Sequence, residues 1–132
     1  MRVNALDHVN IIVADLDAAA RFYTEMLSLE RRDGPPPLTR DNAAWMCDAE
    51  GRPIIHLNSL DCPRVYDRDL SPRPTGALHH VALNCTGHDE MLSRVKERGL
   101  QHDTHYYPSV GLRQIFLFDP HGVLLEMNFF EN

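Results

Sequence analysis

The chain has 132 residues, of which 43% are hydrophobic, and carries a formal net charge of −6. This length allows one compact domain with a sizeable core and is short for two, while the interleaved charges leave no basic stripe for a phosphate backbone. No apolar run approaches the roughly 20 residues that cross a bilayer. We therefore expect a soluble, cytoplasmic protein that binds neither nucleic acid nor membrane. Its three cysteines have no CxxC spacing, so we expect neither disulfides nor a zinc knuckle.

The first half of the chain predicts a strand, a helix and a hairpin. The strand is LDHVNIIV at 6–13. Asp15 or Asp17 can cap the following helix, which ends before Gly34. The hairpin is AAWMC–DAEG–RPIIHLN at 43–58, where the D-x-x-G segment forms a tight turn.

The second half repeats this order after a Pro-rich, charged segment at 60–76, which is interpreted as a linker or as a lid. The strand LHHVALNC at 78–85 precedes a helix that Asp89 opens and that Gly99 ends with a left-handed cap. The stretch HYYPSVG is interpreted as a loop, and RQIFLF–DPHG–VLLEMNF at 113–129 forms the second hairpin.

The two halves indicate a duplicated plan. Aligning the first strands places His8 on His80, and aligning the D-x-x-G turns places His56 opposite Glu126. We expect an α+β fold of two βαβββ modules in a single domain, with module one at about 1–62, a linker at about 63–76 and module two at about 77–132.

Ligand-type side chains fall on the less apolar face of four strands. Strand side chains alternate between faces, so each strand can be divided by counting. The apolar face of each strand suits the module's helix, and the other face then forms a cleft. That face carries three histidines, one carboxylate and several amides: His8, Asn10, His56, Asn58, His80, Asn84, Glu126 and Asn128. His79 alternates to the opposite face and is expected to be structural.

Metal binding is the simplest common explanation for His8, His56, His80 and Glu126. A lone strand histidine is more often a hydrogen-bonded core residue, but four such residues matched across a repeat favour ligands. A carboxylate buried alone is costly, and a divalent cation removes that cost. Three imidazoles and a carboxylate suit one divalent transition metal, Zn, Fe, Ni, Co or Mn, better than Mg or Ca.

The sequence also resembles a known family, the vicinal oxygen chelate superfamily, which includes glyoxalase I, extradiol dioxygenases and bleomycin-resistance proteins. The resemblance lies in LDHVNIIVADLDAAARFYTEMLSLE, GALHHVAL and FLFDPHGVLLEMNF. It implies two βαβββ modules paired into an open, eight-stranded, barrel-like sheet with the helices outside and the metal on the concave side. It also implies a homodimer.

Carried over by position, the resemblance implies metal ligands at His8, His80 and Glu126. His56 occupies a position where the family's isomerases and epimerase have Glu or Gln and many ring-cleaving members have no ligand, so its histidine is a departure. The resemblance to the isomerases also implies that Glu126 serves as a base by loosening from the metal.

Further candidates for catalysis and substrate binding come from the residues themselves. His105 and Tyr106 suit acid–base work, although exposed loop residues are an equal interpretation. Arg113 suits binding of a substrate carboxylate, and the alternative is a solvated residue at the start of a strand. Trp45 suits a wall of the cleft, and the alternative is a residue that fills the core. The amides on the ligand face are candidates for substrate contact: Asn10, Asn58 and Asn128.

Three functions remain open. The first is a glyoxalase- or epimerase-like isomerase or lyase that uses a divalent metal as Lewis acid on a small oxygen-bearing substrate. The second is an Fe(II) extradiol-type ring-cleaving dioxygenase with a triad of His8, His80 and Glu126. The third is a non-catalytic drug- or metabolite-binding resistance protein, against which the intact set of four ligands argues.

Overall fold

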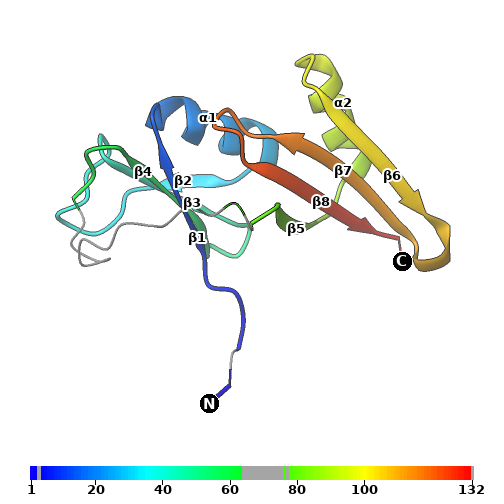
Figure 1. The fold of residues 1–132 in the computed structure, drawn as a ribbon, viewed down its shortest axis with the longest axis horizontal. Coiled ribbons are helices and arrows are strands. Elements are labelled where there is room, and N and C mark those ends of the chain that lie inside the picture. The colour runs from blue at the N-terminus through cyan, green and yellow to red at the C-terminus, as the bar shows by residue number, and fades with distance from the viewer. Residues whose placement is uncertain (3, 64–75, 77, 132) are drawn as a thin grey trace. The chain divides into compact units, whose positions relative to one another are not determined.

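The computed structural model describes residues 1–2, 4–63, 76 and 78–131 (Figure 1). The chain forms two compact units, Met1–Ser71 and Pro72–Asn132. The division falls within the segment 63–76 that the sequence predicts as a linker. The lid interpretation of 60–76 rests mainly on residues outside the described part and stays a prediction.

The first unit contains four strands and one helix. The elements are β1 (Val9–Val13), α1 (Leu16–Leu27), β2 (Glu30–Arg32), β3 (Ala43–Cys47) and β4 (Pro53–Ser59). The strands form one sheet in the order β1-β4-β3-β2. β1 pairs with β4 in parallel, and the other two pairs are antiparallel. The strand after the turn is therefore central and lies beside the first strand.

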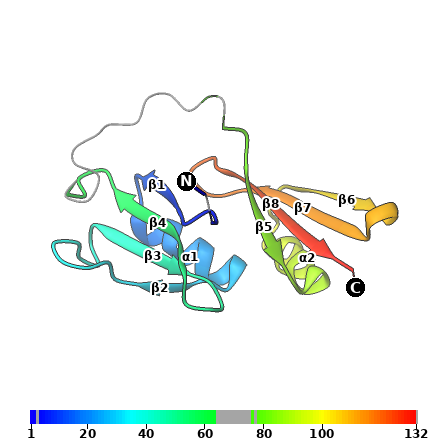
Figure 2. The ribbon, with the colours of Figure 1, turned by 90° about the horizontal axis from the view of Figure 1, so that it is seen from below.

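Helix α1 covers one face of this sheet (Figure 2). Asp15 is its N-cap and accepts the N–H of Ala18 at 3.0 Å, which satisfies one of the free donors of the first turn. The helix buries its apolar stripe, including Tyr23, against the face that carries Ile55 and Leu57. The opposite face of β4 presents His56, as the alternation predicts.

The second unit repeats this order of one strand, one helix and three strands, with one short 3₁₀ helix added. Its elements are β5 (Val81–Cys85), α2 (His88–Glu97), β6 (His102–Tyr107), the short 3₁₀ helix η1 (Pro108–Val110), β7 (Leu112–Phe118) and β8 (Leu124–Phe130). The strand order is β5-β8-β7-β6, with β5 and β8 parallel. Contacts of His88 with Phe129 and of Arg113 with Asp89 place α2 on the face opposite Glu126.

The two D-x-x-G turns have the same geometry. The Oδ1 atoms of Asp48 and Asp119 each accept the backbone N–H of the residues two and four positions later. Gly51 and Gly122 adopt left-handed φ angles of +79° and +86°. Because glycine has no Cβ, it adopts this conformation at little steric cost. The duplicated plan therefore extends to the hydrogen bonds of the turns.

The predicted fold class, α+β from two βαβββ modules, is confirmed, and neither four-stranded sheet closes into a barrel. One element of the prediction is wrong, because His105, Tyr106 and Tyr107 lie in strand β6 rather than in a loop. The two aromatic residues favour a strand at a sheet edge. The rest of the stretch is the 3₁₀ helix Pro108–Val110 and its cap Gly111. Within the described residues, no helix is long and apolar enough to cross a membrane.

Candidate metal centre

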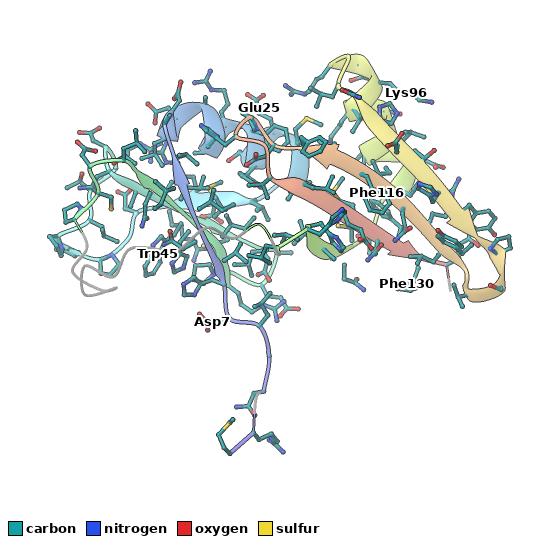
Figure 3. The ribbon with its side chains drawn as sticks, in the orientation of Figure 1. Asp7, Glu25, Trp45, Lys96, Phe116 and Phe130 are labelled. Carbon is teal, nitrogen blue, oxygen red and sulfur yellow. The ribbon has the colours of Figure 1, made fainter. Side chains whose placement is uncertain are left out.

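Two of the predicted ligands, His8 and His56, lie side by side in the first unit. His8 immediately precedes β1, and Asn10 two residues later is paired with His56 on β4. The His8 and His56 rings stack, with centroids 3.8 Å apart and planes 12° from parallel. Trp45 lies on the other neighbouring strand (Figure 3). Its ring stacks with that of His56, with centroids 4.3 Å apart. Because β4 lies between β1 and β3, His56 is held between the other two rings.

His56 has an unusual polar environment. Its Nε2 atom is buried and has no hydrogen-bond partner among the described residues. Burial lowers the pKa of His56 below its ordinary value, and the neighbouring His8 lowers it further. A buried polar atom without a partner is rare in proteins, and a neutral imidazole nitrogen is a common metal ligand. The donor chemistry of this pair therefore fits a cation.

The second unit brings His80 and Glu126 together. The Nε2 atom of His80 lies 2.9 Å from Oε2 of Glu126, and the Glu126 side chain is only 13% exposed. Glu126 pairs with Ala82 on β5, as His56 pairs with Asn10 on β1. His56 and Glu126 thus occupy equivalent sheet positions, which agrees with the turn-based alignment.

The other oxygen of Glu126 is held by Gln114, a residue that the sequence reasoning missed. Its Nε2 donates to Glu126 Oε1 at 2.7 Å and to Asn128 Oδ1 at 2.9 Å. One feature of the sequence could have identified it. Gln114 is an amide among the apolar residues of RQIFLF, and strand alternation places it on the same face as Phe116. Gln114 is 8% exposed, so this bonded group is nearly withdrawn from solvent.

His79 also contacts the second pair. The Nδ1 atoms of His79 and His80 are 3.0 Å apart, and the two rings meet edge to face. Both residues precede β5, whose first residue is Val81, so strand alternation does not separate them. The prediction that His79 points away from His80 is wrong for this reason.

The amide candidates share the faces of the ligand candidates. Asn58 donates from Nδ2 to Asn10 Oδ1 at 3.4 Å, beside His56. In the second unit, Asn128 and Asn84 are paired beside Glu126. Each half therefore presents hydrogen-bonding groups next to its ligand pair.

The remaining candidates divide between the two faces of the second sheet. His105 pairs with Gln114 and shares the face of Glu126. Tyr106 and Arg113 pair with each other on the opposite face. There Tyr106 donates to Glu131 at 3.1 Å, and Arg113 donates to Asp89 at 3.3 Å. Tyr106 and Arg113 therefore lie on the face of the sheet opposite Glu126.

The structure thus gathers the four ligand candidates as two pairs, each within its own unit. Among the residues described, no group of three or more His, Cys, Asp or Glu side chains lies at metal-binding distance. The assignment of all four residues to one cation stays a prediction from the repeat and the family resemblance.

The sequence matches the family model of the Glyoxalase/Bleomycin resistance protein/Dioxygenase superfamily over residues 5–127. The chain belongs to this superfamily. The match covers both modules and all four ligand candidates. A comparison with curated protein sequences found no match.

Solved structures with the same fold include proteins of different activities. A lactoylglutathione lyase from Agrobacterium tumefaciens is 21% identical, with a TM-score of 0.68 over 97% of this chain and 95% of that one. A mutant of the fosfomycin resistance protein FosX from Listeria monocytogenes, complexed with Mn(II) and a dihydroxypropylphosphonic acid, is 19% identical, with a TM-score of 0.68 over 98% and 95%. A glyoxylase/bleomycin resistance protein/dioxygenase domain from Frankia is 23% identical, with a TM-score of 0.70 over 99% and 95%. These likenesses show the fold.

Proposed function

We propose that this protein is a metal-dependent enzyme that acts on a small oxygen-bearing molecule as a glyoxalase- or epimerase-like isomerase or lyase. His8, His56, His80 and Glu126 would hold one divalent transition metal. The set contains three imidazoles and one carboxylate, which suit Zn, Fe, Ni, Co or Mn. We also propose that the protein is a homodimer, as the family resemblance implies.

The observation that carries this proposal is the buried, unpartnered Nε2 of His56, stacked beside His8. Burying an imidazole nitrogen without a partner is unfavourable, and coordination of a cation would remove that penalty. The carboxylate of Glu126 gives independent support, because it is largely buried and aligned on His80. Metal ligands in proteins are commonly oriented by such neighbouring polar groups.

The chain's own groups have distinct roles in the proposed reaction. When bound, the metal supplies a Lewis acid that polarises a substrate carbonyl and stabilises developing negative charge. Glu126 would loosen from the metal so that its Oε2 could take a proton from one substrate carbon and return it to the neighbouring carbon or to the opposite face of the same carbon. Asn10, Asn58 and Asn128 would orient the substrate oxygens, and Trp45 would shield the His56 ring from water. His105, on the same sheet face as Glu126, is a further proton donor.

The names of two structural neighbours agree with this class of chemistry. One is a lactoylglutathione lyase, and the other is a fosfomycin resistance protein complexed with Mn(II). Both have the fold of this chain, and the transfer of their chemistry to this protein is part of the proposal.

A second candidate function is an Fe(II) ring-cleaving dioxygenase in which only His8, His80 and Glu126 bind the metal. The stacking of His56 between two rings favours this alternative, because it gives His56 a place in the fold that needs no cation. His56 would then assist proton transfer from outside the coordination sphere. A non-catalytic binding protein is a third candidate. The presence of all four candidate ligands argues against it.

The test is the metal content of the purified protein and of four alanine variants. We expect the native protein to retain about one equivalent of a transition metal, and His8→Ala, His56→Ala, His80→Ala and Glu126→Ala each to lose most of it. His102→Ala is the matched control, because His102 binds the carbonyl of Leu100 outside the site. Retention in His56→Ala alone would favour the dioxygenase triad. A native protein that takes up no transition metal would favour the binding protein.

A further inference from the structure

Gln114 occupies a central position in the second sheet. It lies on β7, paired with Asn128 on β8 and with His105 on β6. Its side chain reaches diagonally to Glu126, so one nitrogen contacts two oxygens, Glu126 Oε1 at 2.7 Å and Asn128 Oδ1 at 2.9 Å. A carboxamide nitrogen has two hydrogens, and both are used in these bonds.

These bonds fix the orientation of two amides. An ionised carboxylate only accepts hydrogen bonds, so Gln114 must turn its nitrogen rather than its oxygen toward Glu126. The second hydrogen of that nitrogen then requires an acceptor, which sets Asn128 with Oδ1 toward Gln114. Asn128 therefore presents its NH₂ group away from Gln114, where it can donate to an oxygen of a substrate.

The same bonds leave the two oxygens of Glu126 inequivalent. Oε1 is occupied by Gln114, whereas Oε2 is directed to His80 at 2.9 Å. A carboxylate held in this way cannot rotate to exchange its oxygens without breaking a charge-assisted hydrogen bond in a mostly buried site.

The duplicated first unit offers a natural comparison. Ala43 on β3 pairs with Asn58, as Gln114 pairs with Asn128, and it has no polar side chain. The equivalent of Glu126 there is His56, which has no carboxylate to hold. At this sheet position, the unit that contains the acid has a carboxamide and the other unit has Ala43, as a supporting role for the acid requires.

We infer that Gln114 is a positioning residue that holds the Glu126 carboxylate with Oε2 presented to the cation and that sets the donor direction of Asn128. This inference rests on the proposed function, because it assigns Glu126 as a ligand. Groups that orient ligands commonly change metal affinity by about 10- to 100-fold when they are removed.

The test compares Gln114→Met with the native protein in metal affinity and in the visible absorption spectrum of bound Co²⁺. Methionine keeps the length of the side chain and removes both donors. We expect affinity to fall by about 10- to 100-fold and the Co²⁺ bands to shift, because the Glu126 oxygen moves. Gln101→Met is the matched control: it makes the same change at an exposed residue before β6, outside the ligand face, and its affinity and spectrum should stay native.

A second measurement covers the case in which Gln114→Met does not fold. In the native protein, the side-chain NH₂ signals of Gln114 in NMR spectra should stay hydrogen-bonded and shift on addition of Zn²⁺. Signals that do not respond would overturn the inference. If folded Gln114→Met has the native Co²⁺ affinity and spectrum, the inference about Gln114 is overturned and the proposed function is not. If the native protein binds no metal, both are overturned.

Discussion

His56 is the residue that separates the candidate chemistries, and its surroundings make it a weak base. Burial disfavours the charged imidazolium, and the adjacent His8 adds repulsion when it is protonated. The ring is also covered by Trp45 on one side and His8 on the other. A neutral imidazole is the form that binds metals, so this environment keeps His56 ready for coordination near neutral pH.

The lowered pKa of His56 predicts how the stability of the metal-free protein depends on pH. The unfolded chain takes up a proton near the ordinary value of 6.5, whereas folded His56 resists protonation until the pH is lower. The contribution of His56 is thus fully present above pH 6.5 and is lost as the pH falls through the folded pKa. The free energy of unfolding should drop more between about pH 7.5 and about pH 5 in the native protein than in His56→Asn.

Urea denaturation at the two pH values checks this prediction. The other histidines are present in both proteins, so the difference between the two proteins reports on His56. An equal drop in both would show that the folded protein protonates His56 as readily as the unfolded chain does.

At the scale of elements, the turn chemistry was well predicted from sequence, whereas strands β2 and β6 were not. The D-x-x-G segments indicated tight turns, and Gly99 has the left-handed φ expected of a helix end, +61°. β2 was missed because three residues, two of them exposed, give no readable alternation. β6 was misread because five of its six side chains are exposed, which hides a strand pattern.

The second hairpin turn offers a clean test of backbone strain. An ideal Cβ on Gly122 would meet no atom within 4 Å, yet its φ is +86°. Gly122→Ala should therefore cost about 1 to 2 kcal/mol of unfolding free energy through backbone conformation alone. Gly122→Asn should cost less, because asparagine tolerates left-handed φ better than alanine.

The control for this turn is Ser93→Ala, which introduces the same side chain at an exposed position inside α2, where the backbone is right-handed. It should not lower the urea midpoint of the protein. If Gly122→Ala were as stable as Ser93→Ala, the left-handed turn would not contribute as described.

At the scale of the whole molecule, the duplicated plan was predictable because the order of elements and the ligand positions recur. The pairing of His80 with Glu126 follows from the parallel strands β5 and β8. The role of Gln114 was not predictable, because strand alternation gives the face of a side chain and not the partner it reaches diagonally. The contact of His79 with His80 was missed because both residues lie before β5, where side chains do not follow the alternation of a strand.

The proposed four-ligand set also predicts how two defective chains behave together. His8 and Glu126 belong to different units, so His8→Ala and Glu126→Ala should each lose the metal. If each chain supplies all four ligands of its own site, a refolded mixture of the two variants stays metal-free.

Metal analysis of that mixture checks the prediction, and refolded native protein is the control. In a homodimer whose chains exchange units, half of the dimers would be mixed and each would contain one intact site. Roughly a quarter of the sites would then recover metal. Recovery at that level would show that the site is shared between chains.

The ring stack around His56 has a practical consequence. Trp45 is the chain's one tryptophan, and its indole lies 4.3 Å from the imidazole proposed to bind the cation. Indole emission is sensitive to paramagnetic ions and to charge at this range. The light emitted by the native protein should therefore report occupancy during a titration with Ni²⁺ or Co²⁺, so the protein contains its own optical indicator without any added label.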